Sequence, residues 1–402
     1  MPLAVFVLGL SIFALGTSEF MITGLLPGMA ADLGVSIPDA GLLISAFAVG
    51  MVVGAPLLAV GTLKLPRRTT LLALLAVFAG SHVVGALAPG YGLLFATRIV
   101  SALACAGFWA VAAATTVSLV PAARRGRALA VLVGGLTVAN IAGVPAGTFL
   151  GQHAGWRTAF WAVAALTVVA VAGVLAFVPR TVSDSSALRV RVRTELRVFR
   201  NGRVWLALGV IALTQAMVFA TFSYLAPLLT SADGLPSSGV PLVLVLFGVG
   251  AVIGILAGGK LADGRPFPTL YGSLGLAVAA LIALAVTSDT VVAVVAVLVL
   301  GAAAFAANPA LNVRAYSVAG GSSTLVGAST TSGFNVGNTA GPWAGGVAIN
   351  AGLGFPSVAW VSVGLGGLAL TALTFALRLQ RSDDARRPAL SPEEPVIRPA
   401  TR

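Results

Sequence analysis

Long apolar runs occupy most of the chain, and short breaks rich in Pro, Gly or charged residues separate them. A run of about 18 or more apolar residues is long enough for a helix to cross the roughly 30 Å hydrocarbon core of a membrane, whereas barrel strands show a weaker, alternating pattern. The pattern therefore predicts an all-α membrane protein with twelve transmembrane helices. Their predicted limits are residues 3–26, 39–61, 70–88, 91–119, 127–150, 158–178, 204–229, 240–260, 268–287, 290–313, 324–350 and 357–377.

The longest polar link divides the predicted helices six and six. Residues 1–178 are predicted to form an N-terminal six-helix bundle, and residues 204–381 a C-terminal one. The basic link over residues 179–203 is expected to lie in the cytoplasm against anionic lipid headgroups. Residues 382–402 are charged and rich in proline, so we expect a disordered cytoplasmic tail.

The composition excludes a soluble globular protein. Of 402 residues, 58% are hydrophobic and only 9% are charged, and the mean hydropathy is +1.01, whereas soluble proteins carry about 25% charged residues. The net charge of +12 would suggest nucleic acid in a soluble protein. Here the arginines lie mainly in short links, so the expected partner is the lipid bilayer and no nucleic acid. The single cysteine, Cys105, lies in an apolar run, which leaves no disulfide framework.

Charge placement predicts the orientation. The even-numbered links and the C-terminal tail hold the basic clusters, whereas the odd-numbered links hold aspartates and one basic residue, Arg157. Basic residues concentrate on the cytoplasmic side of membrane proteins. Both termini are therefore predicted to be cytoplasmic. The aspartates of the opposite side are Asp32, Asp39, Asp233 and Asp289.

The two halves repeat each other. NIAGVPAG at residues 140–147 aligns with NTAGPWAG at residues 338–345, an offset of 338 − 140 = 198 residues. Small residues recur at every fourth position around both segments, which lets helix backbones approach closely in lipid. Ordinary glycine enrichment is the alternative explanation of any one such face. Two superposing faces favour two pseudo-symmetric bundles that rock around a site near the middle of the membrane. The glycines that align at this offset in the two segments are Gly143 with Gly341 and Gly147 with Gly345.

Only two charged residues lie well inside the predicted spans, Glu19 in the first and Arg98 in the fourth. At about 1.5 Å per residue, both lie roughly 10–12 Å from the outer end of their spans. An acid and a base at equal depth can neutralise each other, which lowers the cost of burying both. One interpretation is a static ion pair that joins two helices. The other, which we favour, is that Glu19 takes up and releases the proton of a proton-coupled carrier.

Polar and aromatic residues on the predicted helix faces are candidates for lining a substrate cavity. Taken singly, each set is better explained by packing between helices than by contact with a ligand. Together they would suit a largely neutral, amphipathic ligand. The candidates are Thr23, Trp109, Asn140, Gln215, Phe219, Phe222, Tyr224, Phe305, Asn308, Asn312 and Asn335.

The sequence disfavours an enzyme. We find no nucleotide-binding loop, metal-ligand cluster or nucleophile–base pair in it. His82 and His153 are interpreted as structural. No cofactor and no metal is expected, and protons are the expected coupling ion.

The chain resembles the major facilitator superfamily, and within it the twelve-span drug:proton antiporters. RRGRALAVLVGGLTVANIAGVPAGTFLG at residues 124–151 resembles their fifth-span signature, with Gly143, Pro145 and Gly147 as its core. ATRIVSALACAGFW at residues 96–109 resembles the fourth-span motif whose buried arginine, here Arg98, is linked to proton transfer. GKLADGRP at residues 259–266 resembles the second-half copy of the family's conserved loop motif, and it supplies Gly259, Asp263 and Arg265.

A narrower resemblance joins the chain to actinobacterial-type chloramphenicol efflux proteins. It is carried by GTSEFMITGLLPGMAADLGVS, AGLLISAFAVGMVVGAP, GWRTAFWAV, TFSYLAPLLT and FNVGNTAGP. The resemblance implies a monomer in a bacterial plasma membrane that exports chloramphenicol-like drugs in exchange for protons and so confers resistance. The first-half loop departs from the family pattern, because Leu65 stands where the pattern has aspartate. The fourth-span motif also departs, with Ser101 and Ala102 where glutamine and glycine are usual.

Two alternatives remain at this point. A proton-coupled exporter of sugars or nucleosides would share the GTSEF run and would be favoured by more polar residues in the cavity. A channel or a receptor would have no conformational cycle, and the repeat argues against it.

Overall fold

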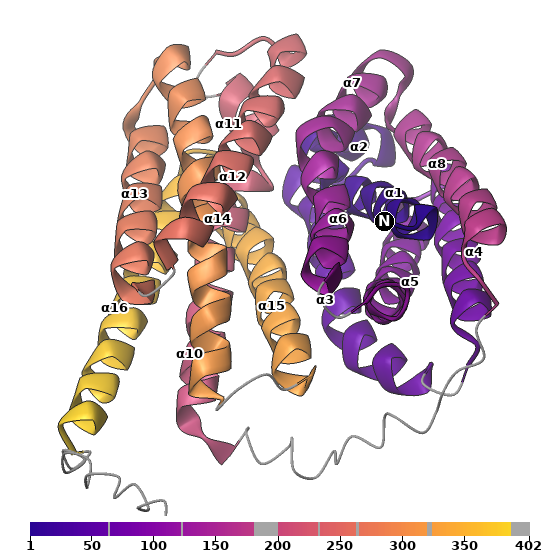
Figure 1. Cartoon of the computed structure of the whole chain (residues 1–402). Helices are drawn as coiled ribbons and strands as arrows, with labels where there is room; N and C mark the ends of the chain where they lie inside the picture. The colour runs from indigo at the N-terminus through magenta and orange to yellow at the C-terminus, as the bar shows by residue number, and fades with distance from the viewer. Residues whose placement is uncertain are drawn as a thin grey trace, which may run out of the picture.

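The computed structural model describes residues 1–62, 65–121, 124–180, 200–231, 234–262, 265–319 and 324–386, and within these ranges the protein is helical throughout. Its helices form two groups that correspond to the two halves of the sequence (Figure 1). The link residues 181–199 and the tail from 387, on which the linker and disorder predictions fall, lie outside the described ranges.

The helices of the first half follow one another with short connections. They are α1 (Leu3–Phe20), η1 (Met21–Gly24), α2 (Leu26–Leu33), α3 (Ile37–Gly61), α4 (Arg67–Ala86), α5 (Tyr91–Ser118), α6 (Arg125–Val138), η3 (Ala139–Gly143), α7 (Val144–Ala154) and α8 (Trp156–Phe177). Those of the second half are α10 (Gly202–Phe222), α11 (Leu225–Ser231), η5 (Ser237–Gly239), α12 (Val240–Ala262), α13 (Pro266–Val286), α14 (Thr290–Val318), α15 (Thr324–Ala348), η6 (Ile349–Leu353) and α16 (Ser357–Arg386).

Eleven helical segments of the described chain are long and apolar enough to cross a membrane. The predicted span that is not among these eleven, residues 324–350, corresponds to α15, which has 25 residues and so measures about 37 Å at 1.5 Å per residue. α15 is rich in Gly, Ser, Thr and Asn, and it packs on α10 of its own half and on α3 of the other. Because protein surrounds much of it, α15 does not need the apolar surface of a lipid-facing helix.

Two spans predicted as single helices are interrupted. The first helix stops at Phe20, a short 3₁₀ turn follows, and α2 restarts with Pro27 in its first turn. The second half repeats this break, since α10 ends at Phe222 and α11 carries Pro227. Proline has no N–H to donate within a helix, but it fits the first turn, where that donor is not needed. A proline at these positions therefore favours the start of a new helix over continuation of the previous one.

The span over residues 127–150 also contains a change of helix type. α6 passes through the π-helical segment η3 before α7 begins with Pro145 near its start. Pro145 cannot donate to the carbonyl four residues earlier, which loosens the turn that contains Asn140. A single-turn π segment of this kind commonly marks a functional site.

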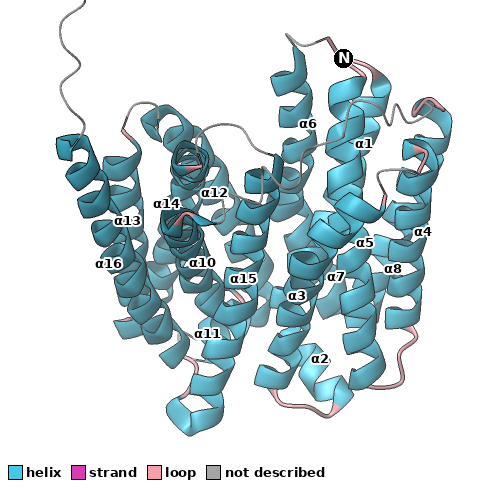
Figure 2. Cartoon of the chain, turned by 90° about the horizontal axis from the view of Figure 1, so that it is seen from below, coloured by secondary structure: helices cyan, strands magenta, loops and turns pink. Residues whose placement is uncertain are grey.

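Both termini of the described chain lie on one side of the molecule, hereafter the termini side, and α2 and α11 lie on the opposite, far side (Figure 2). The halves meet through α3 with α15, through α12 with α7 and η3, and through α11 with α2 and η1. Ser45 Oγ donates to the carbonyl of Thr339 at 3.0 Å, and Gln152 Nε2 donates to that of Ser237 at 2.9 Å. Ser45 lies in the far-side half of α3, and Gln152 and Ser237 lie near the far-side ends of α7 and α12.

Arg157, the one basic residue that the sequence places in the odd-numbered links, is paired with an acid on the far side. Arg157, at the start of α8, forms a salt bridge with Asp32 in α2, and Trp156 Nε1 donates to the same carboxylate at 2.9 Å. These hydrogen bonds, from Arg157 first and then from Trp156, lower the pKa of Asp32 below its usual value. Arg157 therefore ties α8 to α2.

The glycine faces around residues 140–147 and 338–345 lie in tight packing seams as predicted, and α12 carries a further face of this kind. A Cβ on Gly250, Gly254 or Gly258 of α12 would collide with backbone carbonyl oxygens of α14. Gly337 and Gly341 of α15 pack as closely against α10, and Gly143 against Thr17 of α1. A Cβ on Gly147 would lie 3.2 Å from Cβ of Met21, and one on Gly345 would lie 3.0 Å from the ring of Tyr224, both closer than ordinary contacts.

The loop motif is only partly described. Gly259 faces open space, and Arg265 precedes α13. Asp263 lies outside the described residues, as does residue 264. Leu65, in the first-half loop where the resemblance implies aspartate, is 50% exposed.

Substituting Gly254 by Ala should destabilise the second half, because the new methyl group overlaps the carbonyl of Ala302. Overpacking of this kind costs about 1–3 kcal/mol. The matched control is Gly272→Ala in α13, where a Cβ meets open space and a helix former replaces glycine. Thermal unfolding in detergent should show a lowered midpoint for Gly254→Ala alone, and equal midpoints for the two variants would contradict the packing.

Candidate functional site

Glu19 lies in the last turn of α1, directly before the helix breaks at Phe20. Its neighbours Ser18 and Phe20 are buried, whereas Glu19 keeps part of its surface accessible. Broken helices near mid-membrane are where transporters place substrate and ion sites, because chain ends there leave polar groups free. The structure thus places the acid at such a break.

Arg98 binds the end of α1 and not the carboxylate of Glu19. It is 1% exposed, and its Nη1 and Nη2 donate to Ser18 Oγ at 2.9 Å and to the Ser18 carbonyl at 3.0 Å. The guanidinium also lies 4.4 Å above the ring of Phe47. Glu19 interacts with it electrostatically, but in the described chain the one salt bridge is that of Arg157.

The expected direct ion pair is therefore absent from this conformation. The reason is the geometry of the helix. Adjacent residues point about 100° apart around an α-helix with 3.6 residues per turn, so Ser18 and Glu19 cannot face the same partner. Ser18 faces α5 and receives Arg98.

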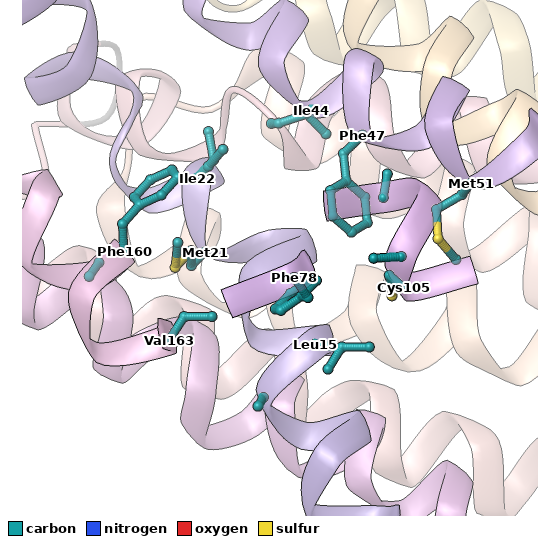
Figure 3. Close-up of a cluster of buried hydrophobic side chains, with 14 of the residues drawn as sticks. Leu15, Met21, Ile22, Ile44, Phe47, Met51, Phe78, Cys105, Phe160 and Val163 are labelled. Carbon is teal, nitrogen blue, oxygen red and sulfur yellow. The ribbon is translucent and has the colours of Figure 1, made fainter. Parts of the chain in front are cut away.

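His82 completes this cluster, and sequence reasoning had interpreted it as merely structural. Its Nε2 lies 2.6 Å from Ser18 Oγ, and its Nδ1 lies 2.8 Å from the carbonyl of Phe78. The imidazole stands between Phe78 and Phe160, with ring centroids at 4.3 and 5.6 Å. Figure 3 shows Phe47, Phe78 and Phe160 among the apolar side chains of this core. The sequence did contain a signal for His82, because an ionisable side chain is rare inside an apolar span and commonly marks a functional site.

A chain of five phenylalanines runs from the α1 break into the second half. Ring centroids are 5.4 Å apart for Phe20 and Phe219, 5.5 Å for Phe219 and Phe222, 4.4 Å for Phe222 and Phe247, and 6.1 Å for Phe247 and Phe305. The sequence-predicted Phe219, Phe222 and Phe305 are thus brought together. Phe20 and Phe247 were missed, because their contacts depend on how the helices pack.

The polar candidates mostly bond to their own helices. Side-chain amides of Asn140, Asn312 and Asn335 donate to carbonyls four residues earlier at 2.9–3.1 Å. Amide oxygens remain without a partner among the described residues at Asn308, Asn335 and the additional Asn338, and so does the hydroxyl of Thr23. Trp109 and Gln215 are partly buried. The structure therefore holds buried hydrogen-bond acceptors whose demand the protein does not meet.

Tyr224 does not line an accessible cavity in this conformation. Its side chain is fully buried (0% exposed). The hydroxyl donates to the carbonyl of Pro342 at 2.8 Å, and a Cβ on Gly41 of α3 would overlap it. Tyr224 belongs to the hydrophobic core of the first half, whereas Phe20 belongs to that of the second. Each half thus inserts an aromatic residue from its own broken helix into the other.

The arrangement has a group that can bind a proton, and we recognise no catalytic chemistry in it. In the described part of the chain, no three His, Cys, Asp or Glu side chains are grouped as metal ligands would be. One carboxylate lies beside an aromatic wall and near a buried cation. Uptake and release of a proton is the chemistry available to such a group.

Comparison with known proteins gives a consistent picture. The family model described as Major Facilitator Superfamily matches residues 8–333. A chloramphenicol resistance protein from Streptomyces lividans is 44% identical over 344 residues, 85% of this chain and 88% of its own. Inner membrane transport protein YdhP of Escherichia coli strain K12 is 37% identical over 374 residues, 93% of this chain and 95% of its own.

Solved transporter structures share the fold. A bacterial homologue of the human lysosomal transporter Spinster, inward-facing and unoccupied, has a TM-score of 0.74 at 19% identity and covers 97% of this chain and 100% of its own. A mutant of the nucleoside transporter NupG has a TM-score of 0.74 at 16% identity and covers 93% and 99%. At these identities the likeness concerns the fold alone.

Replacing Tyr224 by Phe should weaken closure of the far side, because the hydroxyl bonds α15 and touches α3. Loss of one hydrogen bond costs about 0.5–1.5 kcal/mol, or roughly a two- to tenfold change in an equilibrium. Opening of the seam can be followed by labelling a single thiol. For this, Cys105→Ala removes the native cysteine, and Ser45→Cys places a new one at the seam of α3 and α15. In this background, Tyr224→Phe should make the thiol label roughly two- to tenfold faster than it does with Tyr224 intact.

The control is Tyr91→Phe, which loses a hydroxyl bond of 2.6 Å to the carbonyl of Asp39 within one half. Labelling of the thiol introduced by Ser45→Cys should not respond to it. Equal labelling rates in all three proteins would show that Tyr224 does not hold the seam.

Proposed function

The chain belongs to the Major Facilitator Superfamily, and we propose that it exports a neutral, amphipathic antibiotic of the chloramphenicol kind in exchange for protons. The observation that carries the substrate class is the 44% identity, over 85% of the chain, to a chloramphenicol resistance protein. The aromatic chain supports it, because flat, amphipathic ligands bind in apolar sites with few polar groups. As a superfamily transporter, the protein is not an enzyme.

Glu19 is the proposed proton carrier. It is the acid inside a predicted span, it sits at the α1 break, and it remains partly accessible. A protonated carboxyl group is neutral and favours a less hydrated surrounding, whereas the carboxylate favours water or a nearby cation. Changing its protonation therefore biases which arrangement of the two halves is stable.

The coupling provides enough energy for efflux. One elementary charge that moves through 100 mV releases about 2.3 kcal/mol, which alone sustains a drug gradient of roughly fifty-fold. In the proposed orientation the termini side faces the cytoplasm of a bacterium, because the basic links lie there. Contacts between the halves then lie toward the outside, so this conformation is the inward-facing stage of alternating access.

A second candidate is a proton-coupled exporter of sugars or nucleosides. The unpartnered amide oxygens of Asn308, Asn335 and Asn338 favour it. A buried acceptor without a donor costs about 1–3 kcal/mol, and a hydroxyl-rich ligand would supply donors. Chloramphenicol, which carries two hydroxyls and an amide N–H, meets the same demand, so competition between ligands must decide.

Transport measured in inverted membrane vesicles tests the proposal. Vesicles that contain the protein should accumulate radiolabelled chloramphenicol when an acid-inside pH gradient is imposed, and an uncoupler should abolish accumulation. Excess uridine or arabinose should not compete. Competition by either at lower concentration than chloramphenicol would favour the second candidate.

Glu19→Gln should reduce gradient-driven accumulation to the level of vesicles without the protein, because an amide cannot exchange the proton. Drug binding should stay within about threefold, since the glutamine keeps the shape of the side chain. The matched control is Asp32→Asn, which removes a carboxylate on the far side and should keep its response to the pH gradient. Full pH-driven accumulation by Glu19→Gln would exclude Glu19 as the carrier.

A further inference from the structure

A directed hydrogen-bond chain joins α4, α1 and α5 next to the proposed proton site. Three groups form it, namely the imidazole of His82, the hydroxyl of Ser18 and the guanidinium of Arg98. All three side chains are at most 1% exposed. Bonds between groups this deep are electrostatically strong and costly to leave unmade.

The direction of every bond in the chain follows from its two ends. The carbonyl of Phe78 can only accept, so His82 Nδ1 carries the proton in their 2.8 Å contact. The guanidinium of Arg98 can only donate, so Ser18 Oγ accepts in their 2.9 Å contact. A second buried cation beside Arg98 would be costly, so His82 is taken as neutral, and the remaining 2.6 Å contact is then a Ser18 hydroxyl that donates to the lone pair of His82 Nε2.

Ser18 holds Arg98 twice, because its backbone carbonyl also accepts from Nη2 at 3.0 Å. This carbonyl belongs to the last turn of α1, where helix carbonyls lack partners within the helix. A cation at a helix C-terminus is further stabilised by the helix dipole. The break of α1 at Phe20 thus creates a binding site for the guanidinium that competes with the carboxylate one residue later.

We propose that His82 is a positioning residue of the transport cycle. Through the Ser18 hydroxyl it keeps Arg98 bound to the end of α1, and so keeps Arg98 off the carboxylate of Glu19 in this conformation. The proposal rests on the proposed role of Glu19 as proton carrier. Without the acceptor of His82, the Ser18 hydroxyl loses its orientation, Arg98 is released, and the carboxylate gains the cation as a direct partner.

Few other charges can act on Glu19. α5 carries Arg98 and Cys105 and, at its far-side start, Tyr91, and α4, which packs on α5, carries His82 and, at its other end, Arg67 and Arg68. α2 and α12, which contact η1, carry Asp32, which is paired with Arg157, and Lys260, which lies in the last turn of α12. The ionisable residues of α6, α7 and α8 lie at the ends of those helices, namely Arg125 and Arg127 on the termini side and His153 and Arg157 on the far side. The described parts of α3 and η1 place no charged residue nearer than Asp39, at the far end of α3. The position of Arg98 is therefore the main electrostatic influence on the ionisation of Glu19.

The test compares His82→Leu with His82→Gln in proteoliposomes. Leucine removes the acceptor, whereas the glutamine side-chain oxygen can accept from Ser18 as Nε2 does. An opposite charge that comes within about 4–6 Å of a carboxylate favours its ionised form by one or more pH units. The midpoint of the pH dependence of chloramphenicol transport should therefore move about one unit lower in His82→Leu. His82→Gln should keep the wild-type midpoint.

Ser18→Ala provides an independent variant, because it removes the link and leaves the imidazole. It should shift the midpoint in the same direction as His82→Leu. Equilibrium binding of chloramphenicol to each purified variant confirms that the protein is folded. An unchanged midpoint in His82→Leu or in Ser18→Ala, or an equal shift in His82→Gln, overturns the proposal.

The outcome separates this proposal from the proposed function. If wild-type transport shows no pH dependence, or if Glu19→Gln retains it, proton coupling through Glu19 fails and the role of His82 fails with it. If wild type and Glu19→Gln behave as expected and His82→Leu matches wild type, the positioning role alone fails.

Discussion

The cost of placing a guanidinium inside the membrane governs the organisation of the first half. A charged group without partners is expensive in an apolar surrounding, and Arg98 is 1% exposed. The structure meets much of this cost with the end of a helix, while Arg98 Nε has no hydrogen-bond partner among the described residues. α1 stops at Phe20, and the Ser18 carbonyl, the Ser18 hydroxyl and the Phe47 ring all face the cation. The break that stabilises Arg98 also exposes Glu19, so one feature of the backbone provides both members of the pair.

Packing differs within the halves and between them. Inside a half, glycine faces bring helix backbones into direct contact, as α12 and α14 show. In lipid such contacts replace the hydrophobic drive that is missing between apolar helices, and they make each bundle stiff. Across the boundary, the seam of α3 and α15 uses a hydrogen bond from Ser45 and the inserted ring of Tyr224. Two stiff bodies joined by separable contacts are what a rocking mechanism requires.

The exchange of aromatic residues ties the seam to the site. Phe20 follows Glu19 directly and belongs to the core of the second half, where it contacts Phe219. Tyr224 follows the equivalent break of the second half and belongs to the core of the first. A change at either break therefore acts on the partner half through a packed ring. Under the proposed function, proton binding at Glu19 would therefore act on the arrangement of the two halves through these packed rings.

The sequence by itself determined the approximate placement of the apolar spans, the glycine seams and the two interior charges, because hydrophobicity and small-residue spacing act locally along the chain. It also indicated Phe219, Phe222 and Phe305 as members of one wall. It did not indicate the helix breaks at Phe20 and Phe222. Tertiary structure alone decided which groups meet. Arg98 binds Ser18 because adjacent helix positions point in different directions, and His82 joins them from a helix distant in sequence. Tyr224 is fully buried at the seam. Hydrogen bonds and ring contacts depend on helix rotation and depth to within an ångström or so, and no periodicity in the sequence specifies these.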